Sequence, residues 1–257
     1  MSETLVIQSY RTEMVPAWIN SCLGSVRAWA SLCGLDYRFF GDEIFERVPA
    51  WYRERANGRL PVMTDLGRLI LVRDALGSGA RTVFWIDADV FIFDPDELQV
   101  EIDAEYAFSR ELWVQQSARG LKVYRNVHNA FCMFRQGNPF LDFYIHACQS
   151  VLHRVDSGVP NQIVGTKLLT AMHNIIGFPL MEQVGMASPL VLQDLSAGSD
   201  GPALTRLVAK SPTTLRAVNL CGSLVGQKVD GVSINDDLLA RTVEHLNKKG
   251  PSRFRKP

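Results

Sequence analysis

The stretch VFWIDADVFIF, residues 83–93, places two aspartates in a run that is otherwise almost entirely apolar. Residues 83–86 favour β structure and predict a strand buried on both faces, so that Asp87 falls at its carboxyl end. In open α/β sheets, ligands bind at this edge. We therefore expect Asp87 and Asp89 to lie at a binding site.

The two carboxylates cannot both stay ionised in apolar surroundings without a counter-charge, because desolvation and mutual repulsion raise their pKa values. A divalent cation removes both penalties, and oxygen ligands suit Mg²⁺ or Mn²⁺. The pattern favours a metal site formed by Asp87 and Asp89. In the alternative, one aspartate caps the following turn and the other stays in solvent.

A second acidic pair follows closely, Asp94 and Asp96, with Pro95 between them. The proline and the following Glu97 and Leu98 indicate a turn and a helix N-terminus, where acidic side chains suit the helix dipole. This pair is not expected to bind metal.

Before the acidic run, strand and helix patterns alternate. Apolar β-rich runs predict strands at 4–10 and 36–42, and amphipathic patterns predict helices at 15–34 and 62–79. Together with the strand at 83–86, this alternation predicts an α/β fold: a Rossmann-like, mostly parallel sheet with helices on both faces.

After the acidic run, further strands are predicted, followed by two helices. The predicted strands are 105–110 and 129–135, and the predicted helices are 139–155 and 161–174. Residues 187–214 are rich in Ser, Gly, Pro and Thr, which predicts a mobile loop or active-site lid. Residues 1–245 are expected to form a single domain, and the basic segment 246–257 a flexible tail.

Composition excludes several classes of function. Among 257 residues, 27 Lys and Arg balance 27 Asp and Glu, so no basic excess points to nucleic acid. The five cysteines include no C-x-x-C pair, which favours reduced thiols in the cytosol. The sequence begins without a signal-peptide pattern and contains no long apolar run, so we expect a cytoplasmic protein without a transmembrane segment.

The stretch TDLGRLILVRDALGSGARTVFWIDADVFIF, residues 64–93, resembles the donor-binding core of GT-A glycosyltransferases. In that family, an S/T-D-x-x-R helix start precedes a strand and a D-x-D motif. The similarity is to retaining galactosyltransferase and glycogenin-like enzymes and to capsular-polysaccharide-type sugar transferases. It implies a GT-A-like fold and transfer of a sugar from a nucleoside-diphosphate sugar, UDP-linked in preference, to an unidentified acceptor, in the presence of Mn²⁺ or Mg²⁺.

By this resemblance, Asp87 and Asp89 bind the metal, which acts as a Lewis acid on the leaving diphosphate. Asp65 and Arg68 lie three residues apart on one helix face and would contact phosphate or sugar hydroxyls. An ordinary ion pair within the helix is their alternative. The donor-binding set implied is Ser9, Tyr10, Asp65, Arg68, Asp87, Ala88, Asn129, Gly222 and Lys228.

Three later segments extend the resemblance. VHNAFCMF resembles the strand below the sugar, with Asn129 and Ala130 at the matching positions. PNQIVG resembles the pair preceding a helix in retaining members, with Gln162 near the anomeric carbon. We therefore take Gln162, Asn129 and Asp65 as the candidate catalytic residues. Retention of the anomeric configuration is the weakest implication of the resemblance.

The third segment, AVNLCGSLVGQK at 217–228, resembles the H-x-x-G-x-x-K segment that closes the metal site. Here Asn219 stands at the histidine position as the implied third metal ligand, and Lys228 lies one place later than the family lysine. A glycine-rich turn between strands explains this segment equally well.

Two other classes of function remain open. A haloacid-dehalogenase-like, Mg²⁺-dependent phosphohydrolase would use Asp87 as its nucleophile and Asp89 as its acid/base, with Asp236 and Asp237 as later metal ligands. A non-catalytic nucleotide-sugar-binding protein is the other alternative, since Asn219 and Asn161 replace family residues.

Overall fold

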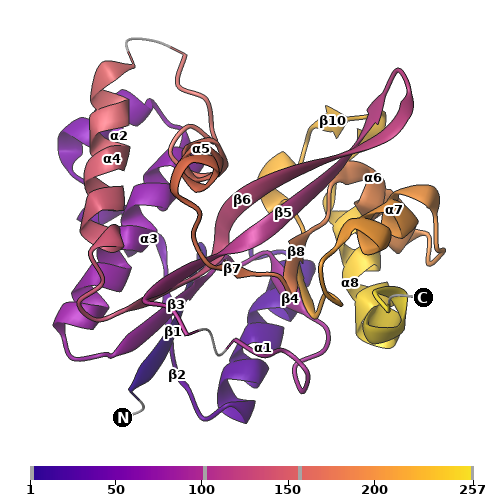
Figure 1. The fold of residues 1–257 in the computed structure, drawn as a ribbon, viewed down its shortest axis with the longest axis horizontal. Helices are drawn as coiled ribbons and strands as arrows, with labels where there is room; N and C mark the ends of the chain where they lie inside the picture. The colour runs from indigo at the N-terminus through magenta and orange to yellow at the C-terminus, as the bar shows by residue number, and fades with distance from the viewer. Residues whose placement is uncertain (1–2, 101–102, 156–157, 256–257) are drawn as a thin grey trace.

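The computed structural model describes residues 3–100, 103–155 and 158–255. Its centre is a six-stranded sheet in the order β2-β1-β3-β6-β5-β7 (Figure 1). The strands are β1 (Thr4–Ser9), β2 (Asp36–Phe40), β3 (Thr82–Ile86), β5 (Tyr106–Ser117), β6 (Gly120–Arg135) and β7 (Leu180–Met181). A smaller sheet has the order β4-β9-β8, formed by β4 (Val90–Ile92), β8 (Val184–Met186) and β9 (Ala217–Asn219).

Helices cover both faces of the central sheet. On one face, α2 (Ala50–Ala56), α3 (Leu60–Gly77), α4 (Phe140–Arg154) and α5 (Thr166–Ile176) enclose a core that includes Trp85 and Phe134. On the other, α1 (Ala17–Leu32) packs its Trp29 against Phe84 and Phe131. The predicted α/β class is thus confirmed.

The sheet is mixed. Strands β2, β1 and β3 run parallel, as expected, and Ile7 of β1 pairs with Trp85 of β3. Strand β6 then joins β3 antiparallel and forms a long hairpin with β5 that extends beyond the main sheet (Figure 1). The sequence patterns had indicated only the inner parts of β5 and β6, because the outer parts alternate polar and apolar residues irregularly.

The expectation of a mobile loop at 187–214 is wrong. This segment forms α6 (Pro189–Ser196) and α7 (Pro202–Lys210), each with a proline in its first turn. Their apolar faces are buried, with Leu192 and Leu207 fully inaccessible. Proline is tolerated in the first turn because the N–H that it lacks would have no intrahelical acceptor there, so these prolines mark helix beginnings and not a loop.

The expected flexible tail is also wrong for the described residues up to 255. Helix α8 (Asp236–Arg253) continues through Gly250 and Pro251. A Cβ on Gly250 would lie 2.7 Å from the Phe93 ring, and Phe254 stacks on that ring with centroids 4.9 Å apart. Close packing against Phe93 therefore orders a segment whose composition alone indicated disorder.

Smaller differences concern element boundaries. Helix α5 begins at Thr166, and residues 161–165 form a turn. Residues 95–97 form the predicted turn, but no helix follows it, and Asp94 instead pairs with Arg216. The remaining elements are the 3-10 helices η1 (Asp42–Arg47) and η2 (Gly222–Leu224) and the strands β10 (Lys228–Val229) and β11 (Val232–Ser233). Among the described helices, none has the length and apolar character needed to cross a bilayer.

Candidate functional site

The turn after β3 carries the acidic pair. Asp87 directly follows β3 and its backbone N–H donates to the Ala130 carbonyl at 2.7 Å, while residues 88–89 form the turn into β4. Because β1 and β3 are parallel, Ser9 and Asp87 lie at the same edge of the sheet. The predicted position of the pair, at the carboxyl edge of the parallel strands, is confirmed.

Asp87 is held by a cation and an indole. Trp85 Nε1 donates to Asp87 Oδ1 at 2.6 Å, and Arg68 Nη1 lies 3.2 Å from the same oxygen. Residues 85 and 87 point to the same face of the strand because side chains alternate along it. This alternation could have identified Trp85 as a partner of Asp87 from the sequence.

Arg68 belongs to a buried network on α3. Its Nη2 lies 3.2 Å from Asp65 Oδ1, and its Nη1 donates to the Asn129 carbonyl at 2.8 Å. Asn129 Nδ2 donates to Asp65 Oδ1 at 2.9 Å. Burial raises the pKa of Asp65 to about 6, against the opposing effects of Arg68 and Asn129. The structure therefore joins Asp65, Arg68, Asp87 and Asn129, which the sequence had proposed separately.

Asp89 is held differently, by neutral donors alone. Asn219 Nδ2 donates to Asp89 Oδ1 at 2.6 Å, and the Gly222 backbone N–H donates to Oδ2 at 2.7 Å. No described Lys, Arg or His forms an ion pair with this carboxylate. Burial raises the pKa of Asp89 to about 6, and the negative charge of Asp87 adds to the rise.

Pairing of the small sheet brings the segment 219–222 to this position. Asn219 lies opposite Val90 in the β4–β9 pair, and Leu220 N donates to the Asp89 carbonyl at 2.9 Å. A Cβ on Gly222 would lie 2.9 Å from the Trp18 ring and 3.2 Å from Asp89 Oδ2, so only glycine fits there without displacement.

Both ends of the Asn219 side-chain amide, the expected third metal ligand, take part in hydrogen bonds. Its nitrogen faces Asp89, and its Oδ1 accepts the Cys221 N–H at 2.8 Å. The opposite amide orientation would place two oxygens together, so this orientation is the favourable one. Asn219 therefore positions Asp89 through its nitrogen, while its Oδ1 holds the Cys221 N–H.

Two carboxylates remain as metal-binding candidates, and they fit a magnesium or manganese ion. No group of three or more His, Cys, Asp or Glu that could hold a metal occurs within the described part of the chain. Mg²⁺ is commonly bound by one or two carboxylates together with substrate phosphates, without a complete protein cage. The unpaired negative charge of Asp89 matches that mode of binding.

The remaining predicted residues fall at different distances from this cluster. Tyr10 lies close enough to Asp89 and Asp236 for both to raise its pKa, although burial is the larger cause. Ser9 Oγ donates to the Gly41 carbonyl at 3.3 Å. Ala88 is buried in the turn between the two aspartates.

Gln162 and Lys228 are exposed. Gln162 lies in the 161–165 turn, which touches the cluster at Gly165, where a Cβ would lie 2.7 Å from Asp65 Oδ2. Tyr144, which the sequence analysis missed, anchors this turn by donating to the Val164 carbonyl at 2.8 Å. Lys228 lies on β10, opposite Ser233 of β11, and among the described residues its side chain forms no ion pair with the cluster.

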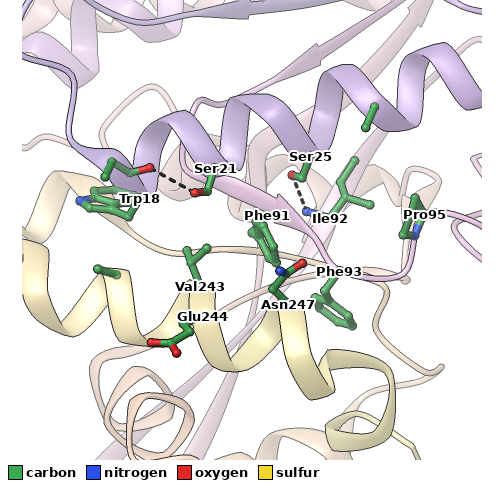
Figure 2. A pocket seen from close by; sticks show the side chains of 13 residues that line it. Trp18, Ser21, Ser25, Phe91, Ile92, Phe93, Pro95, Val243, Glu244 and Asn247 are labelled. Atoms are coloured by element: carbon green, nitrogen blue, oxygen red, sulfur yellow. Dashed lines mark hydrogen bonds between the residues drawn. The ribbon is translucent and has the colours of Figure 1, made fainter.

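A groove lies elsewhere on the molecule. It has a volume of about 480 Å³ and runs between α1, α8 and the end of β4 (Figure 2). Its lining is mainly apolar, with Glu244 as its charged group, and Trp18 is the residue it shares with the surroundings of Asp89. The groove contains none of the site carboxylates.

No protein-family model and no curated protein sequence matches the chain. Among solved structures, it is similar to a glycosyltransferase involved in glycosylation of the major capsid of PBCV-1, at 11% identity and a TM-score of 0.47, covering 95% of this chain and 98% of that one. It is also similar to A197 from STIV, at 11% identity and a TM-score of 0.27, covering 66% and 78%. Both scores are too low to bear on function.

Proposed function

We propose that this protein is a metal-dependent glycosyltransferase that moves a sugar from a nucleoside-diphosphate sugar, UDP-linked in preference, to an acceptor. The observation that carries the proposal is Asp89, a partly buried carboxylate beside Asp87 that has only neutral hydrogen-bond donors. A bound cation would neutralise the charge of such a carboxylate. The resemblance of residues 64–93 to the GT-A core indicates that this cation assists sugar transfer.

The cation would be held by Asp89 and Asp87, with the donor diphosphate completing its coordination. When bound, Mg²⁺ or Mn²⁺ supplies Lewis-acid stabilisation of the charge that develops on the leaving nucleoside diphosphate. Arg68 fixes the orientation of Asp87, and Asn219 with the Gly222 N–H fixes that of Asp89. Both carboxylates are thus held in place before the donor binds.

Tyr10 is the candidate for stacking on the nucleotide base, because it follows β1 directly and lies near Asp89. Asp65 and Asn129 form the floor beneath the sugar in this proposal. Gln162 remains the candidate for a retaining mechanism, supported by the contact of its turn with Asp65 at Gly165.

The test is thermal unfolding with UDP-, GDP- and ADP-sugars, each with and without Mn²⁺. Donor binding raises the melting temperature in a ligand-dependent manner, and one strong response identifies the base and sugar together. Asp89→Ala should abolish the Mn²⁺-dependent shift. Asp96→Ala is the matched control, because Asp96 is an exposed aspartate in the neighbouring turn. An undiminished shift in Asp89→Ala contradicts the proposal.

The phosphohydrolase alternative receives less support from the geometry. Asp236 accepts from Trp18 Nε1 at 2.7 Å, at the start of α8. Release of inorganic phosphate from an aryl phosphate would favour this alternative. Tight donor binding without hydrolysis or transfer would favour the non-catalytic one.

A further inference from the structure

A third acidic side chain, unassigned so far, lies on the long hairpin. Glu111 of β5 is 4% exposed, and its Oε1 accepts from Asn126 Nδ2 at 2.7 Å across the strand pair. Its second oxygen has no hydrogen-bond partner among the described residues, yet it is not one of the fully inaccessible unpaired atoms. Solvent therefore reaches an oxygen that is free to accept a hydrogen bond.

Glu111 also has no cationic partner among the described residues. The neighbouring Arg110 points to the other face of β5, where it pairs with Glu182 at 2.9 Å. A carboxylate that is nearly buried without a counter-charge costs stability, and groups of this kind concentrate at functional sites. This cost gives a reason to look for a function of Glu111.

The position of Glu111 connects it to the acidic pair. The carboxylates of Glu111 and Asp89 both lie close enough to the buried Cys221 thiol to raise its pKa, in addition to the larger effect of burial. Cys221 immediately precedes Gly222, whose N–H bonds Asp89. Glu111 and Asp89 therefore both act on the thiol of Cys221.

The hairpin face that carries Glu111 is also aromatic. Trp113 and Tyr124 are directly paired across the strands, next to the Glu111–Asn126 pair. Because directly paired side chains and those two residues apart share a face, all four project from the same side. Leu112 and Val114, on the opposite side, are buried in the core with α6 and α7.

This face combines a ring that contacts water with planar polar groups. Tyr124 is 40% exposed and has Lys122 Nζ 4.4 Å from its ring centroid. Aromatic rings offer a flat apolar surface with a polar edge, and the Asn126 and Glu111 side chains offer hydrogen bonds. A carbohydrate presents the complementary pattern, with apolar C–H faces and hydroxyl groups around them.

We propose that this hairpin face binds a carbohydrate acceptor and that Glu111 accepts the proton of the attacking hydroxyl. This inference rests on the proposed function. The acceptor oxygen forms a bond to the anomeric carbon while its proton passes to the Glu111 carboxylate. The bond from the anomeric carbon to the diphosphate breaks, and the electron pair leaves on the nucleoside diphosphate. One displacement of this kind inverts the anomeric configuration, in contrast to retention through Gln162.

The surroundings of Glu111 suit a base. Burial raises its pKa to about 7, although the bond from Asn126 opposes the rise. General bases work best when their pKa lies near the operating pH, and they contribute about 10²- to 10⁴-fold to the rate. The thiol of Cys221 does not compete for the proton at neutral pH, because burial raises its own pKa well above the ordinary value.

The experiment measures release of nucleoside diphosphate from the donor found by the unfolding screen, with a panel of p-nitrophenyl glycosides as acceptors. Glu111→Gln should lower the acceptor-dependent kcat by about 10²-fold or more, while Mn²⁺-dependent donor binding stays unchanged. Added formate should partly restore turnover in Glu111→Ala, which a purely structural defect would not allow. Glu182→Gln, in the turn between β7 and β8, is the matched control and should retain activity.

Acceptor contacts have a separate readout. Trp113→Ala and Tyr124→Ala should raise KM for the glycoside more than they lower kcat, and NMR of the first product formed should give the inverted anomer. Turnover of Glu111→Gln within threefold of wild type, a retained anomer, or transfer to hydroxyl-bearing peptides but to no glycoside would each overturn the inference. Absence of donor binding in the wild type would refute the proposed function instead.

Discussion

The two aspartates of the D-x-D motif lie one residue apart in sequence and in opposite electrostatic surroundings. Asp87 belongs to the α3 side of the site, where Arg68 sits between it and Asp65. Asp89 belongs to the side of the small sheet, where Asn219 and the Gly222 N–H are its partners. The α3 side is neutralised in part by the protein itself, whereas the small-sheet side leaves its charge for a bound cation.

The largest expected effect removes the internal cation. Arg68→Ala leaves Asp65 and Asp87 buried or half-buried without a counter-charge, and it should lower the free energy of unfolding by about 3–5 kcal/mol. Urea unfolding monitored by circular dichroism measures this loss of unfolding free energy. Arg68→Lys keeps the charge but loses the forked hydrogen bonds, so its loss should be smaller. Equal losses in both variants would show that charge is not what Arg68 contributes.

Like Asp89, Glu111 has only neutral hydrogen-bond donors as partners. Its contribution to the free energy of unfolding should therefore depend on pH. Its folded-state pKa of about 7 lies above the ordinary value of 4.5, so the folded protein binds the extra proton and loses stability as pH rises from 4.5 through 7. Glu111→Gln should remove this pH dependence, which amounts to about 3 kcal/mol of unfolding free energy. Urea unfolding of both proteins at pH 5 and pH 8 tests it: parallel pH profiles would contradict the shift.

Metal binding should depend most strongly on Asp89, the carboxylate of the small-sheet side. Mn²⁺ with nucleoside diphosphate at about 100 times its Kd should stabilise the wild type by about 2.7 kcal/mol. Arg47→Ala, far from the acidic pair and partnered with Asp74, should respond like the wild type, while Asp89→Ala should not respond. Thermal unfolding at constant ionic strength measures the difference. A response that sodium chloride reproduces would count against a specific metal site.

The smallest effect concerns the amide that holds Asp89. Asn219→Ala leaves one carboxylate oxygen without its donor and should cost about 1–3 kcal/mol of stability. It should also weaken metal-dependent donor binding, because Asp89 is no longer oriented. Asn247→Ala, exposed on α8, serves as a control and should change stability by less than about 0.5 kcal/mol. Denaturant unfolding and donor titration separate the two consequences.

The sequence predicted the α/β class and the placement of Asp87 at a strand end, because buried strands and amphipathic helices leave regular apolar periods. It failed where tertiary packing overrode composition, as at α6, α7 and the end of α8. Pro, Gly and Ser indicated loops there, but burial of Leu192, Leu207 and Phe254 stabilises helices. Among site residues, Trp85 was open to prediction from strand alternation, whereas Tyr144 and Glu111 left no local signal.

By itself, the sequence determined that two carboxylates stand at the end of a buried strand, since the strand pattern and its termination are local properties. Only the tertiary structure decided that Arg68 pairs with Asp87 and that Asn219 and Gly222 enclose Asp89, because these contacts join residues 19, 130 and 133 positions apart. The charge state of a carboxylate depends on every group within a few ångströms, and chain folding alone brings such groups together.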